Sequence, residues 1–462
     1  MGAASEAIEG GGNGDSEGGG IGRSSALLLL AQLSSNLGFF VAVLVLARAL
    51  NPAGRGTVAF VTVGAAVLAR VTQLGVDQAT TVLCAQRPNE RPALLTNLFL
   101  FTVVSSATLG GIVFVALWAL NVHPVGLSHS LLAVLVLGAM ASALAGDGLA
   151  FLLGLGRPGD WTRIASIAPW LYAVALGALW SVGRLHALQA ATAWMLAHFV
   201  WAAAAAVSCR ARTPFGRPRL DLLRDAIALG IRTWGGSLSR FLNFRLDQII
   251  LGSLATAGTL GIYSVAVNVS EVTLYLPGAV AGAVTPAIAR ALPARRVEQA
   301  LKTFRALTAI TLLTIAAAAL AGAFLLPIVF GEIYRSSVVP YLCLLPGAVG
   351  YAAISVFSSA LMSSSKPLLS SLGPVVSLVV GVVFDFALIP PLGATGAGIA
   401  ASAAFIAGGV ASELAYRSVA GFSRTELVPR ASDVREFLLI ARSLGRRYGR
   451  RAAVSEPPIE PT

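Results

Sequence analysis

The sequence predicts an all-α membrane protein with about twelve transmembrane helices in two six-helix bundles, and three observations predict it. Of the 462 residues, 56% are hydrophobic and only 12% are charged, with a mean hydropathy of +0.79. This composition is typical of a polytopic membrane protein. The apolar residues form stretches of about 20, the length that a helix needs to cross a hydrocarbon core of about 30 Å. Short similar segments recur about 204 residues apart.

The two ends of the chain differ in charge from the apolar middle. Residues 1–25 carry four acidic side chains and no basic region before the first apolar stretch, so we expect a disordered cytoplasmic tail rather than a cleaved signal peptide. In residues 418–462, apolar residues at helical spacing alternate with arginines. This pattern predicts a basic amphipathic cytoplasmic helix on the anionic inner leaflet. The connection 295–305 has a similar apolar stripe and is also expected to be a surface anchor.

Twelve apolar stretches lie between the tails. The expected spans are 26–47, 57–76, 94–120, 127–153, 162–182, 187–208, 226–252, 257–281, 306–328, 338–362, 367–390 and 393–416. Residues 26–208 are the predicted first bundle, 209–225 a basic cytoplasmic linker, and 226–417 the second bundle. Lys and Arg concentrate in the even-numbered connections, which places these connections and both termini in the cytoplasm. We therefore expect a multi-pass protein of the cell membrane.

An internal repeat supports the two halves. Residues 49–56, ALNPAGRG, resemble residues 253–261, SLATAGTLG. Residues 156–158, GRP, resemble residues 365–367, SKP, and each of these motifs precedes the fifth span of its half. The two halves are therefore predicted to be a parallel repeat, with a pseudo-two-fold axis along the membrane normal and a substrate site between them.

Span seven, residues 226–252, carries charges where the membrane core is expected. A charge at that depth costs at least roughly 2.5–3.5 kcal/mol, so we expect its polar groups to line a water-filled cavity. At about 100° per residue, one face of a continuous helix would hold Arg232, Gly236, Ser239, Arg240, Asn243 and Asp247. The alternative is that Arg240 and Asp247 neutralise one another while Arg232 extends to the membrane interface.

Other spans add polar groups at membrane depth. Arg70 and Asn36 are candidates to join Arg240 in the cavity, Asn36 because it lies 204 residues before Arg240. A salt bridge between Arg70 and Asp147 is the structural alternative. The candidates for binding a coupling proton or sodium ion are Asp147, Glu271 and Asp385. Hydrogen bonds between helices would be the alternative role for these acidic side chains.

The patterns of an enzyme, a metal site or a nucleic-acid surface are missing. The four histidines lack carboxylates or cysteines at ligand spacing, and the three cysteines show no metal or disulfide pattern. No glycine-rich loop joins a strand to a helix. The net charge of +12 lies in short connections and one tail. We therefore expect no catalytic site, no metal or cofactor and no nucleic-acid partner.

Several motifs resemble those of the polysaccharide repeat-unit flippases of the Wzx type. The resemblance covers about residues 26–417 and includes the repeated element after spans one and seven. Its further motifs are RxDQIILG at 245–252, LGIYSVA at 260–266, VFGxxY at 329–334, SKP at 365–367 and LGATGAGIA at 392–400. These flippases belong to the multidrug/oligosaccharidyl-lipid/polysaccharide (MOP) exporter superfamily, so the resemblance implies a MATE/Wzx-like fold with alternating access.

The resemblance also implies the substrate, a glycan on a polyprenyl pyrophosphate, and contact with the machinery of polysaccharide assembly. Guanidinium groups bind phosphate oxygens through two parallel hydrogen bonds. Arg240 is therefore our candidate for binding the pyrophosphate, with Asn243 and Asp247 orienting it and with Arg232 and Arg70 in the same cavity.

Other functions stay open on the sequence. A peptidoglycan-precursor flippase and a multidrug cation antiporter belong to the same class, although a cation exporter calls for acidic rather than arginine-rich walls. A membrane glycan polymerase or ligase needs a long outward loop with catalytic side chains, whereas the fifth and ninth connections are short. A non-transporting scaffold would leave the charged face of span seven without a role.

Overall fold

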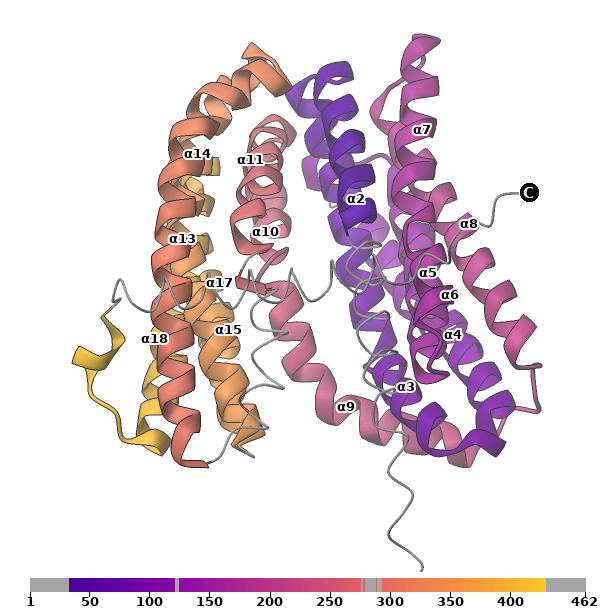
Figure 1. Cartoon of the computed structure of the whole chain (residues 1–462). Coiled ribbons are helices and arrows are strands. Elements are labelled where there is room, and N and C mark those ends of the chain that lie inside the picture. The colour runs from indigo at the N-terminus through magenta and orange to yellow at the C-terminus, as the bar shows by residue number, and fades with distance from the viewer. Residues whose placement is uncertain are drawn as a thin grey trace, which may run out of the picture. The chain divides into compact units, whose positions relative to one another are not determined.

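The computed structural model describes residues 33–428 apart from 121–123, 276, 279–287, 289–292 and 365. Every regular element in this part of the chain is a helix (Figure 1). Contacts divide the chain into two units. Unit 1 consists of Met1–Ile262 with Val329–Ile333, and unit 2 of Tyr263–Ile328 with Tyr334–Thr462.

Unit 1 is built around a central helix, α5. Its helices are Leu33–Ala49, α2 (Pro52–Gln73), α3 (Val76–Gln86), α4 (Arg91–Ala119), α5 (His129–Gly154), α6 (Pro158–Ala165), α7 (Ile167–Ser181), α8 (Ala187–Arg212), α9 (Leu220–Leu242) and α10 (Leu246–Leu254). α5 contacts α2, α3, α4 and α8. Small residues allow this close packing, since a Cβ added to Gly148 would lie 2.6 Å from Ala205 on α8.

Unit 2 has α18 at its centre. Its helices are α11 (Ala257–Ser270), whose first turns belong to unit 1, α13 (Pro293–Phe330), α14 (Val338–Leu344), α15 (Gly347–Ser363), α16 (Pro367–Ser370), α17 (Leu372–Leu392) and α18 (Ala394–Ala420). α18 contacts α14, α15 and α17. The contact with α15 is tight, because a Cβ on Gly350 would lie 2.3 Å from the Phe405 carbonyl oxygen.

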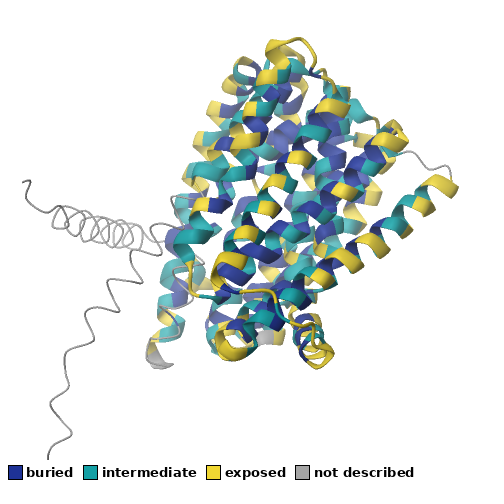
Figure 2. Cartoon of the chain, turned by 90° about the vertical axis from the view of Figure 1, so that its right-hand side faces the viewer, coloured by how far each residue is buried: buried dark blue, intermediate teal, exposed yellow. Residues whose placement is uncertain are grey.

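Eight helices of the described residues are long and apolar enough to cross a membrane, or nine if the bent pair Glu332–Leu344 and Gly347–Ser363 is one span. The three other predicted spans correspond to the shorter helix Leu33–Ala49, to α9 with α10, and to α11. Exposed and partly exposed residues cover outward helix faces (Figure 2). Many are large and apolar, such as Phe324 on α13, which is 73% exposed. Such surfaces are stable in contact with lipid.

Span two, predicted over 57–76, corresponds to α2, and the helix breaks near the predicted end of this span. α2 ends at Gln73, and Leu74 and Gly75 both take a left-handed backbone conformation, with φ of 47° and 75°. The chain then continues as α3. A left-handed leucine is rare because its side chain crowds the backbone, so tertiary packing holds this break in place.

Span seven is two helices rather than one continuous helix over 226–252. α9 ends at Leu242, and α10 begins at Leu246. The prediction that Arg240 and Asp247 share one face of a single helix is therefore wrong, because the constant rotation per residue stops between them.

The predicted surface anchor at 295–305 is wrong as well. These residues are part of α13, and Ala300 and Leu301 lie fully buried in a core with Phe357 and Tyr416. An apolar stripe on a helix has the same period whether it faces lipid headgroups or a protein core, so the pattern alone cannot separate the two.

The backbone repeats where the sequence predicted a repeat. Arg157 precedes α6 with φ −110° and ψ 62°, and Lys366 precedes α16 with φ −116° and ψ 64°. Both short helices begin with proline and end at a serine of nearly identical conformation, Ser166 or Ser371, before a long helix. The GRP and SKP motifs therefore build the same element twice.

The predicted boundary between the bundles stays a prediction. α9 contacts α3 and α4, and α10 contacts α2, so contacts group residues 226–262 with unit 1. The predicted tail over 1–25 and the amphipathic helix expected beyond Val428 lie outside the described residues.

Candidate functional site: a polar cavity in unit 1

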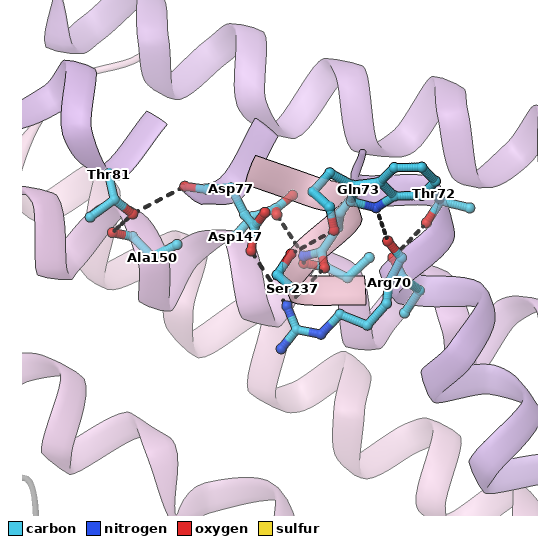
Figure 3. Close-up of polar contacts among 11 residues, drawn as sticks. Arg70, Thr72, Gln73, Asp77, Thr81, Asp147, Ala150 and Ser237 are labelled. Carbon is cyan, nitrogen blue, oxygen red and sulfur yellow. Dashed lines mark hydrogen bonds and ion pairs between the residues drawn. The ribbon is translucent and has the colours of Figure 1, made fainter. Parts of the chain in front are cut away.

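A cavity of about 220 Å³ lies between the α2–α3 break and α9. The lining residues are Arg70, Gln73, Gly75, Asp77, Gln78, Trp234, Ser237, Leu238 and Phe241. Figure 3 shows the polar side chains of α2 and α3 together with Ser237 of α9. The α9 residues follow one another at helical spacing, so a single face of α9 forms one wall of the cavity.

The break positions two opposite charges. Arg70 lies in the last turn of α2 and Asp77 in the first turn of α3. The carboxyl end of a helix carries partial negative charge and the amino end partial positive charge, so each side chain lies near the helix end that favours its own charge. Arg70 Nη1 and Asp77 Oδ2 are 3.4 Å apart.

A glycine pair brings α9 against the break. A Cβ on Gly75 would lie 2.6 Å from the Gly230 carbonyl oxygen, and a Cβ on Gly230 would lie 2.8 Å from the Gly75 carbonyl oxygen. Because neither glycine has a side chain, the two backbones touch. Trp234, one turn after Gly230, donates from its indole Nε1 to the Arg70 carbonyl oxygen at 3.1 Å. This hydrogen bond satisfies one of the carbonyl groups left open at the end of α2.

Gln73 connects the ion pair to a buried carboxylate (Figure 3). Its Oε1 accepts a hydrogen bond from Arg70 Nη1 at 3.3 Å. Its Nε2 donates to Asp147 Oδ1 at 2.9 Å and to the Ala143 carbonyl oxygen at 3.2 Å. The Arg70 side chain is 47% exposed, whereas Asp147 is fully buried. The network therefore leads from a solvent-accessible cation into the helix core.

Aromatic rings complete the wall of the cavity. The Arg70 guanidinium carbon lies 5.7 Å from the centre of the Phe241 ring, a cation–π distance. The lining contains one cation and one anion, Arg70 and Asp77, which face one another. The cavity is thus close to neutral, with an aromatic wall on α9 and a hydrogen-bonding wall on α2 and α3.

Of the residues predicted to line a substrate cavity, Arg70 lies in the lining of this one. Its ion-pair partner is Asp77, and Asp147 contacts it through Gln73 rather than by the direct salt bridge given as the alternative. Sequence reasoning missed Asp77. The signal available was a glycine between Arg70 and Asp77 within an apolar span, at a point where a helix break would bring the two charges together.

The predicted residues of span seven lie outside this lining. Arg232 and Arg240 are exposed on α9 and form no ion pair within the described residues. Asn243 Nδ2 donates to the carbonyl oxygen one turn earlier at 2.9 Å, at the end of α9. Asp247 Oδ1 accepts from the next backbone N–H at 2.7 Å, in the first turn of α10. The roles of these four residues in substrate binding stay predictions.

The remaining candidates are spread over both units. Asn36 is half-buried on the helix Leu33–Ala49 of unit 1, Glu271 is half-buried just after α11, and Asp385 is buried on α17. Their roles in substrate or ion binding stay predictions. Within the described residues, no group of three or more His, Cys, Asp or Glu side chains could hold a metal ion.

The fold is similar to that of solved MOP superfamily transporters. An inward-facing MATE family multidrug resistance transporter is 16% identical, with a TM-score of 0.66 over 84% of this chain and 97% of that chain. The lipid II flippase MurJ, in an inward closed conformation, is 12% identical, with a TM-score of 0.69 over 87% of this chain and 89% of that chain. A MOP superfamily transporter from Pyrococcus furiosus is 16% identical, with a TM-score of 0.61 over 87% of this chain and 95% of that chain. These likenesses confirm the predicted fold.

Sequence comparisons add the family. A search of curated proteins finds no significant match to the chain. The family described as "Polysaccharide biosynthesis protein" matches residues 21–292, which is more than half of the chain and includes every residue of the cavity. Together with the MOP fold, this match confirms the resemblance predicted from the motifs. The chain belongs to the polysaccharide biosynthesis protein family and is a multi-pass membrane protein with the fold of MOP superfamily transporters.

Proposed function

We propose that this protein is a flippase that moves a polyprenyl-pyrophosphate-linked oligosaccharide from the inner to the outer leaflet of the cell membrane. The observation that carries the proposal is a polysaccharide biosynthesis family match on a chain with a transporter fold. A structure of similar fold is a lipid II flippase. A polysaccharide protein built as a transporter would supply the assembly machinery with its lipid-linked precursor and would not itself form glycosidic bonds.

The charges on α9 support an anionic headgroup. Arg240 and Arg232 are exposed and form no ion pair within the described residues, so their guanidinium groups are available to phosphate oxygens. Arg240 remains our candidate for the pyrophosphate. Asn243 and Asp247, at the junction of α9 and α10, remain the candidates for orienting it. Movement of the two predicted bundles would then expose the headgroup to each side in turn.

An ion gradient is the proposed energy source, with a proton or sodium ion moving in the opposite direction. Asp147 has the strongest support of the three acidic candidates, because it is fully buried and joined through Gln73 to the cavity. Glu271 and Asp385 are the other candidates. Proton and sodium movement measured during translocation in sealed vesicles would identify the ion, and translocation that is independent of both gradients would reject coupling.

The test of the flippase uses proteoliposomes that contain a lipid-linked oligosaccharide. The measured quantity is the rate at which the glycan becomes accessible to a membrane-impermeant glycosidase. Arg240→Ala is expected to slow translocation at least tenfold while the protein inserts normally. The matched control is Arg184→Ala, an exposed arginine in the connection between α7 and α8. Unchanged translocation in Arg240→Ala would remove Arg240 from the site, and no translocation by the unmodified protein would reject the flippase.

The same assay separates the main alternative. A peptidoglycan-precursor flippase is the second candidate, favoured by the structural likeness to a lipid II flippase. Its substrate is also a glycan on a polyprenyl pyrophosphate, so Arg240 and Arg232 would bind this pyrophosphate equally well. Translocation of lipid II in preference to polysaccharide repeat units would identify this alternative. Efflux of organic cations without glycan movement would instead identify a multidrug antiporter.

A further inference from the structure

The charges of the unit 1 cavity do not suit the pyrophosphate. Arg70, the lining cation, is paired with Asp77 at 3.4 Å and also donates to Gln73. An anion entering here would compete with the Asp77 carboxylate for one guanidinium and would meet like-charge repulsion. A cationic ligand would meet the guanidinium. The cavity therefore favours an uncharged ligand.

The remaining lining groups have the chemistry that recognises a sugar ring. Trp234 and Phe241 provide flat apolar rings whose faces carry negative charge density, which attracts the C–H groups on the face of a pyranose. Gln73 and Gln78 provide amide donors and acceptors, and Asp77 provides carboxylate acceptors for hydroxyl groups. A mostly apolar wall with a few placed polar groups is the usual form of a specific small-ligand site.

The size of the cavity limits the ligand to about one ring. Its volume of about 220 Å³ is below the roughly 300–1,000 Å³ of sites for drug-sized ligands. A disaccharide would therefore extend beyond it. One sugar unit could occupy the cavity while the rest of the glycan lay outside.

The walls are held in place before any ligand arrives. The backbones at Gly75 and Gly230 touch, and the indole of Trp234 is fixed by its hydrogen bond to the Arg70 carbonyl oxygen. Gln73 is oriented by Asp147. A preformed site loses less conformational entropy on binding, so even a single ring can bind measurably.

We infer that the cavity between the α2–α3 break and α9 binds one uncharged pyranose unit of the glycan and not its pyrophosphate. The inference rests on the proposed function and deepens it by assigning the sugar and the headgroup to different places. Trp234 stacks on the ring, and Gln73, Asp77 and Gln78 bind its hydroxyl groups. The exposed arginines of α9 are then left for the pyrophosphate.

The test is saturation-transfer NMR on the full-length protein in lipid nanodiscs. The probes are free hexoses, 6-deoxyhexoses and N-acetylhexosamines, with inorganic pyrophosphate as a competitor. At least one pyranose is expected to receive saturation, and pyrophosphate is expected not to displace it. Trp234→Ala should weaken binding at least tenfold, and Trp234→Phe should retain part of it. The matched control is Trp180→Ala, an exposed tryptophan on α7 outside the lining, which should bind as the unmodified protein does.

The outcomes separate this inference from the flippase proposal. The inference is overturned if no pyranose binds, if binding does not depend on Trp234, or if pyrophosphate displaces the sugar. Translocation that continues in the vesicle assay would then leave the flippase in place without this sugar site. Sugar binding that depends on Trp234, in a protein that moves no lipid-linked glycan, would retain the site and reject the flippase.

Discussion

Gln73 is the residue that allows a charged pair to sit beside a buried carboxylate. Its amide has both a donor and an acceptor, so it accepts from Arg70 and donates to Asp147 at the same time. A direct contact between the two charged side chains would draw the guanidinium away from the cavity. With Gln73 between them, Arg70 stays at the cavity wall and Asp147 keeps a hydrogen bond in the core.

The two members of the ion pair should respond differently to loss of the partner. Arg70→Gln leaves the Asp77 carboxylate, whose side chain is 9% exposed, with little solvent to replace the guanidinium. Asp77→Asn leaves Arg70, whose side chain is 47% exposed and can still be hydrated. Arg70→Gln is therefore expected to lower the melting temperature more than Asp77→Asn, as measured by thermal unfolding in nanodiscs.

The double variant Arg70→Gln/Asp77→Asn serves as the control for this comparison. It removes both charges, so it should be more stable than Arg70→Gln alone. If Asp77→Asn lowered the melting temperature more than Arg70→Gln, the Asp77 carboxylate would be stabilised mainly by groups other than Arg70.

At the scale of elements, the crossing of α9 over the α2–α3 break decides whether the cavity exists. Gly230→Ala would place a Cβ 2.8 Å from the Gly75 carbonyl oxygen and 3.0 Å from that of Leu74. Both neighbours are backbone atoms, so α9 must move away. We expect a lower melting temperature and loss of pyranose binding, measured by the NMR assay.

Gly235→Ala is the matched control on the same helix. A Cβ there meets no atom within 4 Å, and alanine is more stable than glycine in a helix by about 1 kcal/mol. This variant should bind sugar as the unmodified protein does and melt at the same or a higher temperature. Equal losses in both variants would mean that the glycine contact does not hold α9 in place.

The elements show which parts of this structure could be predicted from the sequence. Hydropathy located most of the spans, because length and apolarity determine what can cross a bilayer: eight or nine of the described helices are long and apolar enough, and the other three predicted spans correspond to shorter or divided helices. It could not locate the breaks. Leu74 is an ordinary helix former, and residues 243–245, between α9 and α10, contain neither glycine nor proline. Gly75 is a local signal for the first break, although a glycine does not by itself end a helix, whereas no residue type in 243–245 marks the second break.

The candidate site was also predicted only in part. Arg70 was found because a charge at membrane depth is costly wherever it lies. Asp77 was not found, because it is the break between α2 and α3 that brings it next to Arg70. On α9, the charged face drew attention to Arg232 and Arg240, whereas the face that packs against the break is the one with Trp234 and Phe241. Which face of a helix meets its neighbour is a tertiary property.

At the scale of the whole molecule, the predicted repeat has a physical counterpart in a reciprocal backbone contact. A Cβ on Gly56 would lie 1.7 Å from the Ala257 carbonyl oxygen, and a Cβ on Gly261 would lie 1.9 Å from the Pro52 carbonyl oxygen. Gly56 and Gly261 are 205 residues apart, as are Pro52 and Ala257. Each contact is therefore the copy of the other under the repeat, as expected of two elements related by a two-fold axis.

Adding a methyl group on either side of this contact should have the same effect. Gly56→Ala and Gly261→Ala each place a Cβ on a backbone oxygen, so each must separate the start of α2 from the start of α11. We expect falls of similar size in melting temperature and in the rate of glycan translocation. Gly177→Ala on α7, where a Cβ meets no atom within 4 Å, is the control and should change neither.

The double variant Gly56→Ala/Gly261→Ala tests whether the two contacts act as one. Once the first methyl group has separated the elements, the second finds the space already open, so the double variant should lose clearly less stability than the two single variants added together. Additive losses would mean that each glycine packs independently. Unequal falls in melting temperature from the two single variants would mean that the two contacts have similar geometry but contribute differently to stability.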